Sequence, residues 1–378
     1  MPKAIAIAGV AETQYVRHPD RGISAASLLA EAGQLGVRDA GLELRDVDGL
    51  GVASFSLAPD HAIDLAWKLG IHPKWLMDDA NGGVSAFNLI HHAMRAIESG
   101  DATNILIICG DVIRDFDALA NNYNVVTRDL LAPMRYGGPN SLFALLTLRH
   151  MTRHGLGRED YAQIPILQRR WAALNPGAVY RETLDLEAYL AAPIVCYPLC
   201  VYDCPPIVAG ANAAVVSAQH SEARLEVKIR NLALIYNVDN QEGDGLNSGL
   251  AHIREALFTG AKLQPRDIDI LSIYDDYPVM VLAQLGDLGY LSASTIKAFI
   301  RDELASGNLK LNTSGGQLSA GQAGLAGSMH GLVEAVRQLR GQAGDRQVKQ
   351  ARTALVTGYG MVLYRYGAAA AAAILEAA

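Results

Sequence analysis

Apolar and polar positions along the chain alternate in a pattern typical of strands followed by helices. In the first part they predict strands at 3–11, 47–55, 103–111 and 210–218 and helices at 24–41 and 84–99. The order recurs later, with strands predicted at 226–236, 267–276, 351–359 and 368–377 and helices at 246–260, 278–289 and 328–340. This alternation predicts an α/β protein of two similar halves, with sheets packed between helices.

Residues 112–208 break the regular pattern, because they are rich in Arg, Tyr and Pro and show no strand alternation. Helices are expected within this segment, and a loop domain that covers an active site fits it better than a linker. We therefore predict an N-terminal half at 1–222, which includes the loop domain, and a C-terminal half at 223–378.

One stretch, "DDANGGVSAFNLIHHAMRAIESGDATNILIICGD" at 78–111, predicts a glycine turn, a helix that stops at Gly100, and a buried strand. Ser85 suits a helix cap better than a nucleophile. The backbone N–H groups of the turn, at Gly82, Gly83, Val84 and Ser85, are expected to form a pocket that favours an anion and binds substrate.

Composition narrows the class of protein. The chain has 378 residues, half of them apolar, and a net charge of -7 with no basic stripe, so we expect a large core and no nucleic-acid partner. No apolar run reaches the ~20 residues that span a bilayer, and the N-terminus does not resemble a signal peptide, so a cytoplasmic protein without membrane contact is expected.

The cysteines are too few for a disulfide framework: Cys109, Cys196, Cys200 and Cys204. The spacing of the last three would suit a metal on a helix, but several prolines in this segment argue against a helix, and no nearby histidine completes a set of ligands. We expect packing thiols and no metal site.

Several motifs taken together resemble the thiolase superfamily, more narrowly the sterol-carrier-protein-type thiolases and thiolase-like lipid-transfer proteins. They are the two similar halves and the segments "YGGPNSLFALLTLRHMTRHG", "YPLCVYDCPPIVAGANAAVVSA", "NTSGGQLSAGQAGLAG" and "LVEAVRQLRG". The resemblance covers essentially the whole chain. It implies a five-layered αβαβα fold made of two homologous halves with an inserted loop domain, a dimer, and a substrate activated as a coenzyme A thioester.

The chain departs from the family at the positions that carry thiolase chemistry. The nucleophilic cysteine before the helix corresponds to Gly83, or to Val84 if the turn shifts by one. Tyr274 replaces a histidine in "YDDY", Gln322 replaces the histidine of Gly-His-Pro, and Tyr359 lies in the "TGYGM" loop where thiolases carry a second cysteine. Claisen chemistry through an acyl-cysteine has therefore lost its nucleophile and its bases.

The surviving chemistry is a retro-aldol cleavage of a β-hydroxyacyl-CoA with a steroid, aromatic or other bulky acyl chain, as the resemblance to steroid side-chain aldolases implies. Coenzyme A would be part of the substrate, and no covalently bound cofactor is expected. The candidate catalytic residues are Tyr274 and Tyr359 as acid/base groups, Asp275 to orient the loop, and Asn312 as a hydrogen-bond donor. Gln322 would be a second donor that binds substrate, and Tyr197 a residue of the acyl pocket.

Each of these residues also has a structural alternative. The tyrosines suit core packing, Asp275 suits a strand-end cap, and Asn312 suits the turn in which it lies.

Two alternative functions stay open. The first is a catalytically silent subunit beside an active thiolase paralogue, in a complex with a small zinc-ribbon/OB-fold protein that the family resemblance implies as a partner. The second is acyl transfer with another nucleophile, Cys204 or Cys109, although a thiol in a buried strand such as that of Cys109 tends to be inert.

Overall fold

The computed structural model describes residues 5–57, 61–114, 127–134, 138–218, 226–238, 242–291, 296–362 and 367–378. Within these residues the main sheet has nine strands: β1 (Ala6–Glu12), β2 (Gly49–Ala53), β3 (Trp75–Asp79), β4 (Asn104–Asp111), β7 (Gly210–Ser217), β8 (Val227–Tyr236), β9 (Ile270–Ser272), β10 (Thr353–Val362) and β11 (Gly367–Ala377). Their order is β3-β2-β4-β7-β1-β8-β11-β10-β9.

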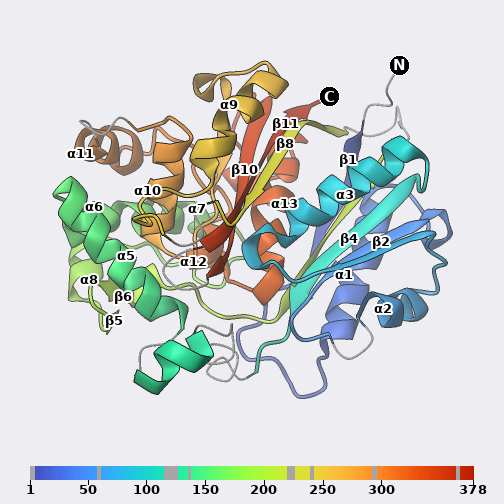
Figure 1. The fold of residues 1–378 in the computed structure, drawn as a ribbon, viewed down its shortest axis with the longest axis horizontal. Coiled ribbons are helices and arrows are strands. Elements are labelled where there is room, and N and C mark those ends of the chain that lie inside the picture. Colours follow the sequence, from blue (N-terminus) through green and yellow to red (C-terminus); the bar gives the residue numbers. More distant parts are fainter. Residues whose placement is uncertain are drawn as a thin grey trace.

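The sheet consists of two parts that meet at a short junction. β1 and β8 pair antiparallel at two positions, Ala6 with Lys228 and Ile7 with Val227. Figure 1 shows the blue and cyan elements of the N-terminal part on the right and the orange and red elements of the C-terminal part towards the left. We call these parts the N-terminal and the C-terminal sheet, although the junction makes them continuous.

Helices lie outside and between these two sheets, and the alternation of side chains along the strands shows the layers. On β4, Leu106 and Ile108 pack with α1 (Ala25–Asp39) and α2 (His61–Leu69), whereas Ile105 and Ile107 face a middle core. That middle core contains α3 (Ser85–Ser99) and α13 (Gly327–Leu339) together with strands of both sheets.

The C-terminal sheet repeats the arrangement. On β11, Ala371 and Ala373 face the middle core, and Ala370 and Ala372 face an outer core with α9 (Leu250–Ala261) and α10 (Pro278–Asp287). The order helix, sheet, helix, sheet, helix is the five-layered αβαβα architecture expected from the sequence, so this prediction is confirmed.

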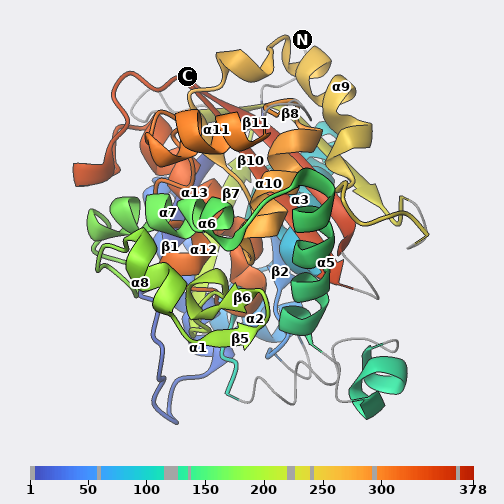
Figure 2. The ribbon, with the colours of Figure 1, turned by 90° about the vertical axis from the view of Figure 1, so that its left-hand side faces the viewer.

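The segment between β4 and β7 is largely helical, as expected. It contains α5 (Pro139–His154), α6 (Arg158–Tyr161), α7 (Gln163–Ala173), α8 (Leu186–Ala191) and a hairpin of β5 (Ile194–Cys196) and β6 (Leu199–Cys200). Figure 2 shows these green elements gathered on one side of the molecule. Phe143 and Leu167 anchor them to the outer core that contains α10.

Most predicted elements are present with shifted ends, and three features differ from the prediction. The strand β3 at Trp75–Asp79 was not predicted, because this short edge strand has three apolar residues followed by two acidic ones, so apolar and polar residues do not alternate along it. The strand predicted at 267–276 is much shorter, because β9 ends at Ser272 and the chain then enters an irregular segment. A short helix, α12 (Gly316–Ala320), lies within the predicted glycine-rich turn.

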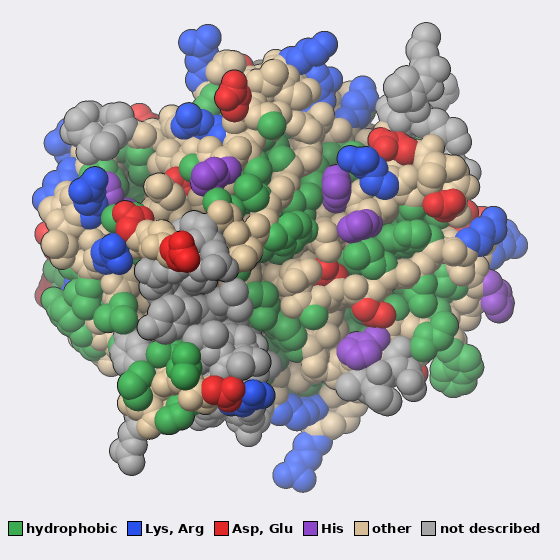
Figure 3. Space-filling model, in the orientation of Figure 1, with side chains coloured by type: hydrophobic (Ala, Val, Ile, Leu, Met, Phe, Trp, Pro, Cys, Tyr) green, Lys and Arg blue, Asp and Glu red, His purple; other side chains and the backbone are tan. Residues whose placement is uncertain are grey.

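Charged side chains concentrate at the outside of the molecule. On the face seen in Figure 3, Lys and Arg side chains lie mainly around the outline, and hydrophobic side chains are exposed nearer the centre. No helix of the described residues is long and apolar enough to cross a membrane.

Asp111, at the end of β4, ties together two loops. Its Oδ1 accepts hydrogen bonds from the backbone N–H groups of Phe55 and Ser56 at 2.7 and 2.8 Å and from the hydroxyls of Ser54 and Ser56 at 2.9 and 2.7 Å. Its Oδ2 accepts from the N–H of Leu325 at 2.8 Å. Because Asp111 is buried, these donors have no water to replace it.

We expect Asp111→Ala to lower the free energy of unfolding by about 3 kcal/mol or more, because it leaves several buried donors unpaired. Asp101→Ala is the control, since the Asp101 side chain is exposed, and its cost should stay within about 0.5 kcal/mol. Urea unfolding measures both, and equal costs would show that Asp111 does not hold these loops.

Candidate active site

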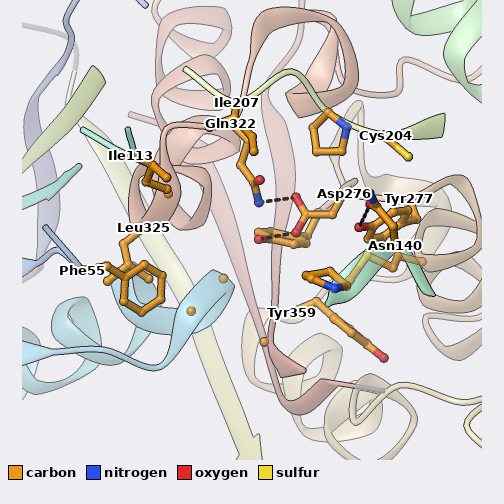
Figure 4. A pocket seen from close by; sticks show the side chains of 18 residues that line it. Phe55, Ile113, Asn140, Cys204, Ile207, Asp276, Tyr277, Gln322, Leu325 and Tyr359 are labelled. Carbon is orange, nitrogen blue, oxygen red and sulfur yellow. Dashed lines mark hydrogen bonds between the residues drawn. The ribbon is translucent and has the colours of Figure 1, made fainter. Parts of the chain in front are cut away.

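A cleft of about 880 Å³, its open mouth included, lies where β10, the turn before α3 and the segment after β9 meet. Both halves and the segment between β4 and β7 contribute to it (Figure 4). The residues that line it are Phe55, Gly82, Gly83, Ile113, Pro139, Asn140, Cys204, Pro205, Ile207, Tyr274, Asp276, Tyr277, Met280, Gln322, Gly324, Leu325, Tyr359 and Gly360.

Gly83, the first of the two positions at which the resemblance places a nucleophilic cysteine, has no room for a side chain. A Cβ atom at this position would lie 2.5 Å from Cε2 and from Cζ of Tyr274, and it would also meet the carbonyl oxygen of Tyr359. The ring of Tyr274 therefore occupies the space into which a side chain at position 83 would project. Gly82 beside it has a φ of 63°, which favours glycine.

Tyr274, Asp276 and Gln322 form a connected group in the cleft. The Tyr274 hydroxyl donates to Oδ2 of Asp276 at 3.0 Å, and Nε2 of Gln322 donates to Oδ1 of Asp276 at 2.7 Å (Figure 4). Burial, reinforced by the neighbouring Asp275, raises the pKa of Asp276 to about 7, although the two hydrogen bonds act in the opposite direction. A carboxyl group with a pKa near neutrality can both accept and release a proton.

Asp275 faces away from the cleft and lines a second, smaller cavity. Its carboxyl accepts from Nε2 of Gln168 at 2.8 Å and from the backbone N–H groups of Gln317 and Leu318 at 3.0 and 3.3 Å. Burial raises the pKa of Asp275 to about 7, against these hydrogen bonds and the charge of His330. Asp275 thus holds the start of α12, which agrees with the expected role in orienting the loop.

Asn312 also lies outside the cleft. Its side chain accepts from the N–H of Ile273 at 2.7 Å and donates to the carbonyl of the same residue at 2.9 Å. Its φ of 48° lies in the left-handed region, where asparagine is well tolerated. In this structure the Asn312 side chain thus links its turn to the end of β9 through two hydrogen bonds.

Tyr359 lines the cleft with its hydroxyl turned away from Asp276 (Figure 4). The hydroxyl accepts from the N–H of Gly367 at 3.0 Å, and the ring makes an edge contact with Phe143 at a centroid distance of 6.2 Å. The structure thus brings Tyr274 and Gln322 together around Asp276, but not the hydroxyl of Tyr359.

The other predicted binding residues divide between the cleft and its surroundings. Gly82 and Gly83 line the cleft, whereas Val84 and Ser85 are fully buried behind it. The side chain of Tyr197 is 62% exposed, and it is not among the residues that line the cleft. The structure therefore shows no contact between Tyr197 and the cleft that would support its predicted place in the acyl pocket.

Cys204 lines the cleft, but Cys109 does not. Burial and the nearby Asp203 raise the pKa of the Cys204 thiol well above its usual value. Burial likewise raises the pKa of the fully buried Cys109. Both thiols are therefore protonated at neutral pH and are poor nucleophiles.

Asp276 was missed by the sequence reasoning. The signal was the pair of adjacent aspartates in "YDDY", because two neighbouring side chains on an extended segment point in opposite directions. If Asp275 anchors the protein interior, Asp276 is the carboxyl that faces outward. Tyr277 was missed as well; its hydroxyl donates to Oδ1 of Asn140 at 2.6 Å in the same cleft.

Comparisons with known proteins agree with the fold. Residues 240–376 match the family described as thiolase C-terminal domain-like. The chain is 29% identical over 378 residues to a steroid side-chain-cleaving aldolase of Thermomonospora curvata, with 91% of this chain and 93% of the relative covered. It is 27% identical over 379 residues to an acetyl-CoA acetyltransferase of Methanothermobacter thermautotrophicus, with 94% and 96% covered.

A solved structure titled Ltp2-ChsH2(DUF35) aldolase matches with a TM-score of 0.82 and 27% identity, covering 100% of this chain and 98% of that chain. Together with the five-layered fold, these matches confirm the resemblance that the motifs indicate. The chain is therefore similar over most of its length to proteins of the thiolase superfamily, and Gly83 and Val84 stand where the resemblance places a nucleophilic cysteine.

We expect Gly83→Ala to lower the free energy of unfolding by about 1–3 kcal/mol, because the added methyl group overlaps the Tyr274 ring and the Tyr359 carbonyl. Gly22→Ala, which meets no atom within 4 Å, should be near neutral. In a Tyr274→Ala background the cost of Gly83→Ala should fall, and a double-mutant cycle by urea unfolding measures this coupling. A coupling of zero would contradict the contact between these two residues.

Proposed function

We propose that this protein cleaves the Cα–Cβ bond of a β-hydroxyacyl-CoA by a retro-aldol reaction, without a covalent acyl-enzyme. The observation that carries the proposal is the Tyr274 ring in the space of the missing cysteine, with its hydroxyl on Asp276. A relative named as an aldolase over most of both chains supports the same class of reaction. Coenzyme A enters as part of the substrate.

The reaction needs one proton acceptor beside the β-hydroxyl. The hydroxyl proton passes to the Tyr274 oxygen, while the Tyr274 proton passes to Asp276. The Cα–Cβ bond then breaks, an aldehyde or ketone leaves, and the electron pair forms the enolate of the shortened thioester. Tyr274 then donates a proton to the enolate carbon and regains one from Asp276, which gives the shorter acyl-CoA and restores the Asp276 carboxylate.

The developing enolate oxygen needs hydrogen-bond donors. Gly82 and Gly83 line the cleft just before α3, and the first N–H groups of a helix have no partner within it. Gln322 has a second amide N–H besides the one that contacts Asp276. These groups would stabilise the negative charge.

The cleft wall favours a bulky apolar acyl chain. Phe55, Ile113, Ile207, Met280 and Leu325 contribute apolar side chains to it. Such a wall suits a steroid or aromatic group, whose binding gains from the burial of apolar surface. The relative from Thermomonospora curvata is named for steroid side chains, which fits this substrate class.

Acyl transfer is the weaker candidate, although one relative is named as an acetyltransferase. It would need a thiolate in the cleft, and the raised pKa of Cys204 disfavours one.

We further propose a dimer and a partner protein with a zinc ribbon and an OB-fold. The related aldolase structure carries both Ltp2 and ChsH2(DUF35) in its title, which supports a partner for this chain as well. Co-purification with a co-expressed candidate of that kind tests this assembly, and failure to co-purify would count against it.

We expect Tyr274→Phe to lower kcat by about 10²–10⁴-fold, because it removes the hydroxyl that carries the proton. Tyr277→Phe is the matched control in the same cleft, since its hydroxyl contacts Asn140 and not Asp276. The assay follows release of the aldehyde or ketone and of the shorter acyl-CoA, with the partner present if one co-purifies. Equal losses in the two variants, or full activity in Tyr274→Phe, would contradict the proposal.

We expect kcat to fall as the pH drops below about 7, because protonation of Asp276 removes the proton acceptor. Gln322→Leu removes a hydrogen bond that stabilises the Asp276 carboxylate, so its pKa rises and the acid limb of the pH profile moves to higher pH. Steady-state kinetics between pH 5 and pH 9 measure the shift. A limb that stays in place, or that moves to lower pH, would show that Asp276 is not the acceptor.

A further inference from the structure

A chain of buried side chains lies behind the cleft and connects the two halves of the molecule. His330, on α13, contacts Oε2 of Glu12 through Nδ1 at 2.9 Å and the Ser314 hydroxyl through Nε2 at 2.8 Å. Glu12 ends β1, and Ser314 belongs to the turn before α12. The His330 side chain is 4% exposed, so bulk water does not screen its charge.

His330 and Asp275 line the same narrow cavity of about 10 Å³, together with Tyr274, Ser314 and Gln317. Tyr274 lines this cavity as well as the cleft, so the residues 274–276 separate the two spaces. The imidazole thus faces Asp275 from behind, while Asp276 faces the cleft.

We propose that His330 is a positioning residue: held by Glu12 and Ser314, its imidazolium keeps Asp275 as the ionised member of the carboxyl pair and leaves Asp276 to exchange a proton with Tyr274. The proposal rests on the proposed function for the role of that exchange. Its electrostatic part concerns the free protein and can be tested without substrate.

The hydrogen bonds of the two carboxyls support this division. Asp275 accepts from three N–H groups, of Gln168, Gln317 and Leu318, and such fixed donors stabilise a carboxylate. Asp276 has the Tyr274 hydroxyl as a partner, which can donate to a carboxylate or accept from a carboxylic acid. Asp276 can therefore change its protonation state and keep this partner, with one fixed donor, Gln322, on its other oxygen, whereas both oxygens of Asp275 accept from fixed N–H donors and its protonation would displace at least one of them.

The charges around His330 favour its protonated form. Burial opposes the positive charge, but Glu12, Asp275 and Glu334 outweigh it and raise the pKa of His330. In turn, burial opposes the negative charge of Glu12, but His330 and Arg337 outweigh it and lower the pKa of Glu12 to about 2.

The remaining groups near His330 add little net charge. Glu334 is paired with Arg346, with 2.8 Å between Oε2 and Nη2. Tyr15 lies 3.4 Å from Nδ1 of His330 through its hydroxyl, and burial raises its pKa well above the usual value, so it stays neutral. Glu12 contacts both His330 and Arg337, with 3.4 Å between Oε1 and Nη1 of Arg337, so these three groups together carry a net positive charge, and His330 is the member that lines the cavity with Asp275.

Removal of that charge should exchange the order in which the two carboxyls ionise. Without the imidazolium, Asp275 holds its proton to higher pH. A neutral Asp275 no longer repels a charge on Asp276, so Asp276 ionises at lower pH.

The test is a titration by NMR of protein labelled with ¹³C at the aspartate carboxyl carbon, with Asp275→Asn and Asp276→Asn to assign the two signals. In the wild type Asp275 should titrate at the lower pH of the two. In His330→Gln the midpoint of Asp275 should rise and that of Asp276 should fall, each by about half a pH unit or more. The acid limb of kcat should move to lower pH in parallel.

Two further variants separate charge from structure. Glu12→Gln removes the anion that keeps His330 protonated, so it should shift both midpoints in the same directions as His330→Gln. Ser314→Ala removes a hydrogen bond but no charge, and the midpoints should stay in place. Circular dichroism and urea unfolding confirm that each variant is folded, and Glu12→Gln serves if His330→Gln does not fold.

The outcomes distinguish this proposal from the proposed function. Unchanged midpoints in both His330→Gln and Glu12→Gln, or the same shift in Ser314→Ala, would overturn the role of His330 whatever the activity. Shifted midpoints in a protein that cleaves no β-hydroxyacyl-CoA would uphold the electrostatic arrangement and overturn the proposed function.

Discussion

The contact between the Tyr274 ring and the backbone of Gly83 is the constraint on which the site depends. A side chain at position 83 and this ring cannot occupy the same volume, so the absence of a nucleophile and the presence of the tyrosine are one structural feature. Gly360 belongs to the same arrangement, because a Cβ atom there would lie 2.6 Å from the backbone nitrogen of Gly83. Close approach of β10 to the turn before α3 thus fixes where the tyrosine hydroxyl can lie.

The layers of the fold also determine where the other polar groups of the site lie. The middle layer places the starts of α3 and α13 beside the cleft, and the segment after β9 supplies two adjacent carboxyls that point to opposite sides. Asp275 anchors α12 in the interior, while Asp276 meets the Tyr274 hydroxyl in the cleft. One short segment therefore both anchors α12 and supplies the carboxyl that contacts the Tyr274 hydroxyl.

Much of the fold could be predicted from the sequence, because buried strands such as "TNILIICGD" and amphipathic helices have strong periodic patterns. The edge strand at Trp75–Asp79 could not, since apolar and polar residues do not alternate along it. The motifs predicted Tyr274 and Gln322 as residues of the site. They did not predict their partner Asp276, because the direction of its side chain depends on the course of the backbone after β9. The hydroxyl of Tyr359 and the side chain of Asn312 bind backbone groups that no local pattern identifies.

The measurement that tests the central claim most directly is the intact mass of the protein, quenched while it turns over a bulky β-hydroxyacyl-CoA. We predict an unmodified mass at every time point while the aldehyde or ketone and the shortened acyl-CoA accumulate. An acyl adduct on the protein that forms and decays at the rate of turnover would contradict the account.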